Sequence, residues 1–102
     1  MHKRLLRPDR LRRVPKQFSW VDHRLVREHH LQQCTVEGCA LYLFLLTVAD
    51  AQGLSYYAER SLAARLPLDV EGVRRAGKDL IAADLIAFDA PLYQVLALET
   101  WQ

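Results

Sequence analysis

The chain has 102 residues, of which 51% are apolar and 25% are charged, and its formal net charge is +2. This length suits one domain with a single modest core and is too short for two. The longest apolar segment, 39–49, falls well short of the roughly 20 residues that cross a bilayer, so a membrane span is excluded. The N-terminus lacks the apolar stretch of a secretory signal, and two cysteines make no disulfide framework, so we expect a cytoplasmic protein.

Charge is distributed unevenly along the chain. Residues 1–16 hold seven basic residues and one acidic residue, a net charge of 7 − 1 = +6, whereas residues 17–102 hold seven basic and eleven acidic residues, a net charge of 7 − 11 = −4. Pro8 and Pro15 oppose helix formation in the first segment. We therefore predict an extended or disordered basic arm over residues 1–17 and one domain over 18–102. Such an arm suits phosphate contact through counterion release, although a solvated tail is the simpler alternative.

The first part of the domain predicts two helices. Phe18–Val21 has the composition of a strand, and Asp22–Leu31 has helical spacing with Asp22 as a cap. We expect Trp20 and Val21 to anchor this start in the core. Thr35 is a capping residue for a second helix, which is apolar on nearly every face from 39 to 49 and should be the central, buried helix. Gly53 then supplies the positive φ of a helix end.

The second part predicts a strand, two helices and a hairpin. Leu54–Tyr57 is strand-like, and Ala58–Leu66 is an amphipathic helix that Pro67 ends. Asp69 caps a helix over 70–83, whose buried stripe is Val73, Ala76, Leu80 and Ile81. Gly72 and Gly77 weaken this helix and suggest close backbone approach, either to a neighbouring helix or to a phosphate. The strand-like segments 85–88 and 93–96 are joined by the short loop 89–92.

These segments resemble a known family. Segments 41–46, 49–53 and 56–57 resemble the start of the winged-helix domains of plasmid replication initiators and phage replisome organisers, and 61–66, 73–76 and 79–86 resemble their helix-turn-helix and the start of their wing. The chain is also similar to small bacterial helix-turn-helix proteins. The resemblance covers about 35–98 and implies a mostly α fold with a small antiparallel β-sheet, a three-helix core plus a β-hairpin wing, here with an extra N-terminal helix.

The resemblance also implies a duplex DNA partner and a recognition helix in the major groove. By position, the candidates that face the groove are Glu71, Arg74, Arg75 and Lys78. Arg60 and Arg65 would lie nearer the phosphates. In the arm, the expected backbone contacts are Arg10, Arg12, Arg13 and Lys16. The wing departs from the family pattern, because its loop carries Asp89 and no cation.

Other chemistries find less support. His29, His30, Cys34 and Cys39 are of zinc-binding type, but their spacing matches no known finger or ribbon, so we expect no metal. Ser19, Asp22 and His23 are sequence neighbours without a catalytic motif, and the chain is short for a pocket. We therefore expect no enzyme activity, no cofactor and no small-molecule ligand. Most aromatic residues are expected in the core, with Tyr56 or Tyr57 turned outward, the set being Trp20, Tyr42, Phe44, Tyr56, Tyr57, Phe88 and Tyr93.

The expected function is non-catalytic DNA binding, in transcription regulation or in replication or mobility of a plasmid, phage or insertion element. The alternative is a winged helix that acts as an assembly module, its acidic surface docking a basic protein. A homodimer stays open, because the first helix adds apolar surface and Trp101 suits either packing on the fold or a subunit interface.

Overall fold

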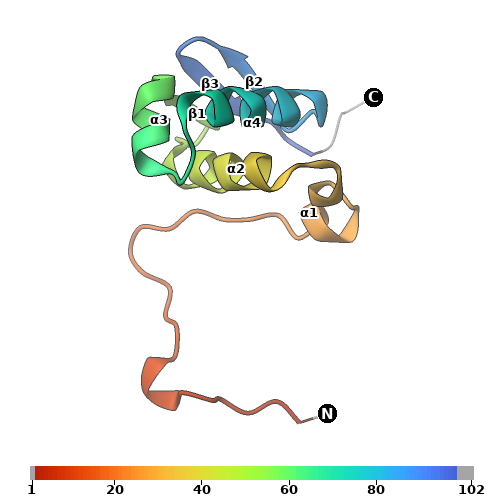
Figure 1. Cartoon of the computed structure of the whole chain (residues 1–102). Helices are drawn as coiled ribbons and strands as arrows, with labels where there is room; N and C mark the ends of the chain where they lie inside the picture. The colour runs from red at the N-terminus through yellow and green to blue at the C-terminus, as the bar shows by residue number, and fades with distance from the viewer. Residues whose placement is uncertain (1, 99–102) are drawn as a thin grey trace.

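A computed structural model of the chain describes residues 2–98 (Figure 1). Along these residues the elements are the 3-10 turns η1 (Pro8–Arg10) and η2 (Leu31–Gln33), the helices α1 (Arg24–Arg27), α2 (Val36–Val48), α3 (Glu59–Arg65) and α4 (Val70–Ala82), and the strands β1 (Leu54–Tyr56), β2 (Ile86–Asp89) and β3 (Leu92–Val95). The structure confirms the predicted combination of helices with a small antiparallel sheet. None of the described helices is long and apolar enough to span a membrane.

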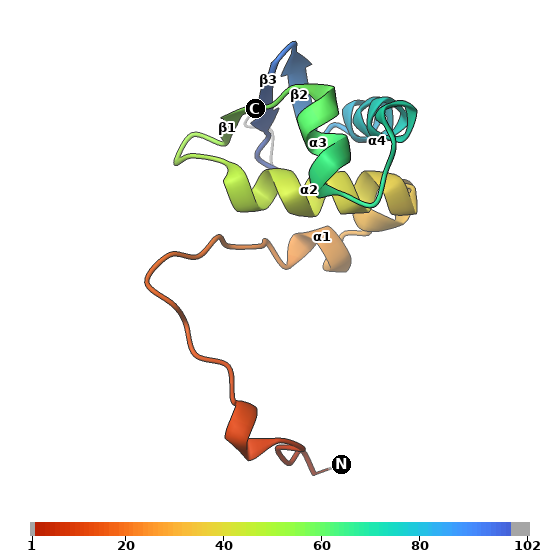
Figure 2. The same cartoon turned by 60° about the vertical axis from the view of Figure 1, so that its left-hand side comes forward.

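Helix α2 lies at the centre of the domain. Figures 1 and 2 show α4 and the sheet on one side of α2, and α1 with the preceding chain on the other. Side chains from these elements form one apolar core of Leu25, Leu41, Tyr42, Leu45, Leu62, Val73, Ala76, Leu80, Leu85, Ile86 and Tyr93. The prediction of a central helix is confirmed, except that Val36, Leu43 and Thr47 are exposed.

A tertiary contact completes the cap of α2. Thr35 Oγ1 accepts a hydrogen bond from the Gly38 N–H at 2.9 Å, as an N-cap residue does. In a capping box the Thr35 N–H would bond to a Glu or Gln at position 38. Asp79 of α4 takes that role instead, because its Oδ2 accepts from the Thr35 N–H at 2.7 Å and from the Thr35 hydroxyl at 2.9 Å. A Cβ at position 38 would collide with this carboxylate, which explains the glycine.

Helix α4 is amphipathic, with one correction to its predicted stripe. Asp69 caps its start by accepting from the Gly72 N–H at 2.7 Å, as expected. Val73, Ala76 and Leu80 are buried, whereas Ile81 is 45% exposed. Ile81 lies one residue past Leu80, so the helix turns it about 100° away from the core.

The sheet has the strand order β1-β3-β2, and both pairings are antiparallel. Leu54 pairs with Gln94, and Ile86 pairs with Val95. The hairpin turns at Ala90–Pro91, whose peptide bond is cis. Gly53 has the predicted positive φ, +86°, but it does not end α2, whose C-cap is Ala49; it turns the chain into β1 instead. A side chain there would meet the Val95 carbonyl oxygen at 2.6 Å.

The predicted start of the domain is wrong in three respects. Residues 18–21 form no strand, and α1 covers only four residues of the predicted helix 22–31. Trp20 is 74% exposed and Val21 is also exposed, so neither anchors the core, and Leu25 alone of this region is fully buried. The helix stops early because the chain reaches His29 with φ +65°, a left-handed conformation that ends a helix.

The aromatic residues divide between core and surface. Tyr42 and Tyr93 are buried, and Phe44 packs edge-on against Tyr57 with ring centres 5.1 Å apart. Tyr56 points outward, as alternation along the strand predicts. The core prediction is wrong for Trp20 and only half right for Phe88, which is partly exposed and stacks on Tyr93 at 4.4 Å.

Candidate nucleic-acid interface

One side of α4 carries all of its charged residues except Asp79, which bonds to Thr35. Glu71, Arg74, Arg75 and Lys78 are all exposed, opposite the stripe that Val73, Ala76 and Leu80 bury. The spacing of three and four residues explains this common face. In Figure 2, α4 is seen nearly end-on, with α2 beneath it and α3 beside it. The four residues predicted to face a groove thus share one accessible surface.

Arg74 is held by two carboxylates. Its Nε donates to Glu59 Oε2 at 2.8 Å, and its Nη1 donates to Glu71 Oε1 at 2.6 Å. Glu59 begins α3, and Glu71 lies one turn before Arg74 on α4. The hydrogen bond to Glu59 is the main reason that the pKa of Arg74 is raised above its ordinary value. Its side chain is nevertheless 50% exposed, so the pair lies at the surface.

Arg75 is held by a carboxylate from α2. Its Nη2 lies 3.0 Å from Glu37 Oε2, and its Nε donates to Glu37 Oε1 at 3.4 Å. This hydrogen-bonded pair raises the pKa of Arg75. The arginine is 62% exposed and the glutamate 35%, so the carboxylate forms the inner half of the pair.

The other cations near α4 differ in their surroundings. Lys78 and Arg60 are exposed and have no ion-pair partner within residues 2–98. Arg65 donates to the Ser61 carbonyl oxygen at 3.3 Å, and its guanidinium lies 6.0 Å from the centre of the Tyr57 ring. Arg65 is therefore partly committed to its own helix and to a cation–π contact.

The arm leaves the domain on the far side of α2. Every residue from 2 to 21 is exposed, and Figure 1 shows the chain leading away from the body, with η1 as its only turn. Arg7 pairs with Asp9 at 2.8 Å. Among the described residues, none forms an ion pair with the four predicted backbone contacts, Arg10, Arg12, Arg13 and Lys16. The arm and the α4 face do not form one continuous surface, because α2 separates them (Figures 1 and 2).

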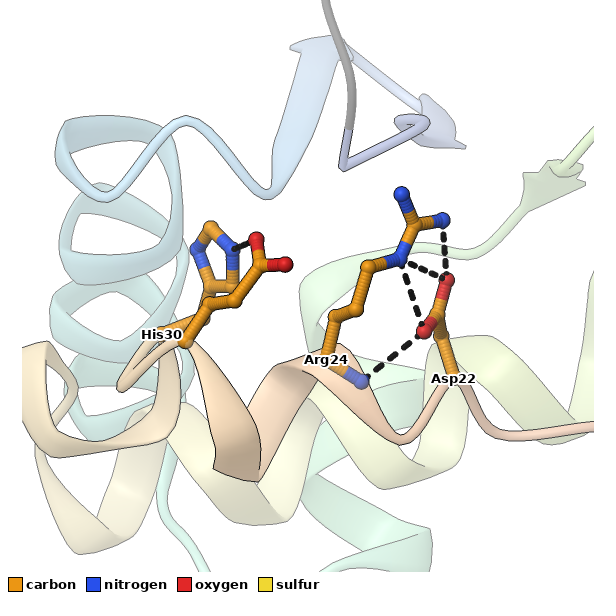
Figure 3. Close-up of polar contacts among 4 residues, drawn as sticks. Asp22, Arg24 and His30 are labelled. Atoms are coloured by element: carbon orange, nitrogen blue, oxygen red, sulfur yellow. Dashed lines mark hydrogen bonds and ion pairs between the residues drawn. The ribbon is translucent and has the colours of Figure 1, made fainter.

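Residues 18–24 run along α2 and line a hollow of about 500 Å³ with the end of α2 and the segment after β3. Ser19 Oγ donates to the Thr47 carbonyl oxygen at 3.2 Å. Figure 3 shows Asp22 and Arg24 pointing toward one another, with the Arg24 N–H and guanidinium both donating to the carboxylate. The hydrogen bond from Arg24 lowers the pKa of Asp22 from 3.8 to about 2.

The metal and catalytic candidates are not gathered into sites. Within residues 2–98 no three His, Cys, Asp or Glu side chains are placed to hold a metal ion. Cys34 donates to the His30 carbonyl oxygen at 3.6 Å, and burial raises the pKa of its thiol. His30 Nε2 lies 3.7 Å from Glu28 Oε1 (Figure 3). Ser19 donates to the Thr47 carbonyl oxygen, and Asp22 accepts from Arg24. Within residues 2–98, neither side chain forms a hydrogen bond with His23.

Sequence reasoning missed the carboxylates that hold the two arginines. Glu37 and Glu59 each stand in the first turn of a helix, where acidic residues are ordinary complements of the helix dipole. Their positions 38 and 15 residues before their partners carry no local signal. Only the crossing of three helices brings them beside α4.

Comparison of the chain with protein families, with curated proteins and with solved structures finds no match. Trp101, which the sequence suggested for packing or for a subunit contact, lies outside the described residues.

Proposed function

We propose that this protein is a winged helix-turn-helix protein that binds duplex DNA without catalysis, in transcription regulation or in replication or mobility of an extrachromosomal element. The observation that carries the proposal is the arm, where seven cations stand against one carboxylate on a wholly exposed segment. The order β1, α3, α4, β2, β3 is compatible with a helix-turn-helix followed by a wing.

The arm supplies most of the long-range attraction. On the α4 face three cations, Arg74, Arg75 and Lys78, stand beside three carboxylates, Glu37, Glu59 and Glu71, so the charges balance. A balanced surface attracts a polyanion weakly, whereas each arm cation that neutralises a phosphate releases counterions. Binding would therefore begin at the arm, and α4 would add contacts within the groove.

An extended arm has the reach for this arrangement. Sixteen residues in extended conformation span about 50 Å, at roughly 3.3 Å per residue. That length lets the arm pass around a duplex from the far side of α2 while α4 lies in the major groove. We assign no DNA contact to the hairpin, because its residues 86–95 include Asp89 and no cation.

The test is a salt titration of the full chain against a mixed-sequence duplex, followed by fluorescence anisotropy. The wild-type protein should bind with an affinity that falls steeply with salt. A variant with Arg10, Arg12, Arg13 and Lys16 replaced by Gln should lose about 3 to 4 from the slope of log affinity against log salt, because each phosphate contact contributes about 0.9. Arg27→Gln, which removes an exposed cation from α1, is the matched control and should leave the slope nearly unchanged.

Two results would overturn the proposal. The first is wild-type protein that shows no salt-dependent binding even at low salt. The second is an arm variant whose slope equals that of Arg27→Gln, since the arm would then contribute no phosphate contacts.

A second candidate is an assembly module that docks on a protein. The exposed apolar side chains around residues 18–26 favour it, namely Phe18, Trp20, Val21 and Val26. An acidic docking surface has less support, because four carboxylates of the domain are already paired with arginines, namely Asp22, Glu37, Glu59 and Glu71. Absence of DNA binding by the wild-type chain would favour this candidate.

A further inference from the structure

The two arginines of the α4 face are paired in the same way. Each donates its Nε and one Nη to carboxylates, and in each case a partner comes from a different helix. One Nη group of each guanidinium is left without a hydrogen bond to the described residues, Nη2 in Arg74 and Nη1 in Arg75. Each guanidinium therefore keeps one Nη group that can donate to a planar acceptor.

The Glu37 carboxylate packs against Gly72 of α4. A Cβ on Gly72 would lie 2.8 Å from Glu37 Oε2, so a side chain at position 72 would require this carboxylate to shift. Gly72 is buried against this contact in the first turn of α4. Gly72 thus packs against a side chain of the neighbouring helix α2.

Glu59 holds Arg74 from the other flank. Both cross-helix carboxylates are less exposed than their partners, 34% for Glu59 and 35% for Glu37 against 50% and 62% for the arginines. In each pair the carboxylate is therefore the more buried group, and the guanidinium is the more exposed one. Because the pairs are exposed and screened by salt, an arriving phosphate or guanine edge can exchange with them.

We propose that Glu37 and Glu59 are specificity-determining competitors, which hold Arg75 and Arg74 away from phosphates of arbitrary sequence and release them where a site offers a matched acceptor. This inference rests on the proposed DNA-binding function. With the carboxylates present, a non-specific duplex gains little from the α4 face, since each new phosphate contact replaces an existing ion pair. The arm then supplies non-specific attraction, and α4 is reserved for the correct sequence.

The experiment measures full-length Glu37→Gln and Glu59→Gln against the mixed-sequence duplex across a salt series. Glutamine keeps the shape of the side chain and removes its charge. Glu37→Gln should bind about 3- to 10-fold more tightly than wild type at low salt, and its slope should steepen by about 0.9, the increment for one added phosphate contact. Glu59→Gln should change affinity and slope in the same direction but by less, because Glu71 still accepts from Arg74 Nη1. Far-UV circular dichroism checks that the fold is retained.

Two further variants separate release of an arginine from a simple change of net charge. Glu28→Gln makes the same change on the exposed surface near α1, and it should change affinity by less than about 2-fold with an unaltered slope. Glu37→Gln combined with Arg75→Gln should return the slope to the wild-type value, because the released guanidinium is then absent.

The inference is overturned if wild-type protein binds but Glu37→Gln and Glu59→Gln bind with wild-type affinity and slope, or if Glu28→Gln gives an equal gain. Those results leave the DNA-binding proposal standing. If neither wild type nor the variants bind the duplex, the proposed function fails and this inference fails with it.

Discussion

At the scale of single residues, the contact between Asp22 and Arg24 shows how a local pair sets a titration. The two residues are separated by one position, and the carboxylate accepts from both the backbone N–H and the guanidinium of Arg24. Both contacts favour the ionised carboxylate, so the pKa of Asp22 falls to about 2. The same carboxylate accepts from the backbone N–H of Arg24, the first residue of α1, the helix that brings Leu25 into the core.

The depressed pKa of Asp22 predicts an acid dependence. A carboxylate whose pKa is lower in the folded state contributes stability that is present above the unfolded value, 3.8, and is lost as the pH falls toward about 2. Asp22→Asn removes this contribution. We expect denaturant unfolding of wild type to lose more stability between pH 4.5 and 2 than unfolding of Asp22→Asn. Parallel losses in the two proteins would contradict the expectation.

At the scale of elements, α2 and α4 are joined by a capping contact as well as by apolar packing. Thr35 caps α2 from within, and Asp79 of α4 completes the cap from outside. The two helices therefore support one another, because the start of α2 is satisfied only when α4 is in place. Position 38 carries glycine and not the Glu or Gln of a capping box, and Asp79, 44 residues after Thr35, supplies the missing carboxylate.

This contact predicts a measurable coupling. Asp79→Ala should lower the free energy of unfolding by about 1 to 2 kcal/mol, the usual cost of a lost cap with its hydrogen bonds. Thr35→Ala should cost a similar amount. The double variant should lose less than the sum of the two, because both remove one network. Additive losses in urea denaturation would show that the two residues act independently.

Within α4 the two glycines have different surroundings. Gly72 sits against the Glu37 carboxylate, whereas a Cβ on Gly77 would have no neighbour within 4 Å. Close packing therefore accounts for Gly72 alone. No contact of the described residues explains Gly77.

At the scale of the whole molecule, the arm and the core are structurally separate. The arm buries none of its side chains between residues 2 and 16, and the core draws on residues from Leu25 onward. Its cations take no part in the packing, because none of residues 2–16 belongs to the core. Figure 1 shows this separation as a chain that leaves a compact body.

The separation predicts independent effects on binding and stability. Replacing Arg10, Arg12, Arg13 and Lys16 by Gln should leave the free energy of unfolding within about 0.5 kcal/mol of wild type, as exposed substitutions usually do. The same variant should lose affinity for the duplex. A loss of several kcal/mol in thermal or urea unfolding would mean that the arm packs on the domain.

The sequence by itself determined the local features of this protein. Capping, φ preference and apolar spacing act within a few residues. They predict the helix starts at Thr35 and Asp69, the turn at Gly53, the two strands of the hairpin and the polarity of α4. The same reasoning placed Arg74, Arg75 and Lys78 on an exposed face. It failed at residues 18–31, because this segment is held by contacts with the rest of the domain, through Ser19 to Thr47 and through the buried Leu25, which no local pattern predicts.

Only the tertiary structure decided the partners of those features. The carboxylates beside Arg74 and Arg75, the outside cap from Asp79, the exposure of Trp20 and the position of the arm behind α2 each depend on how helices cross in space. Capping and periodicity describe one segment at a time, whereas a charge is neutralised by whichever opposite charge lies nearest, at any separation along the chain. Sequence patterns that span a few residues therefore could not predict the charge balance of the α4 face.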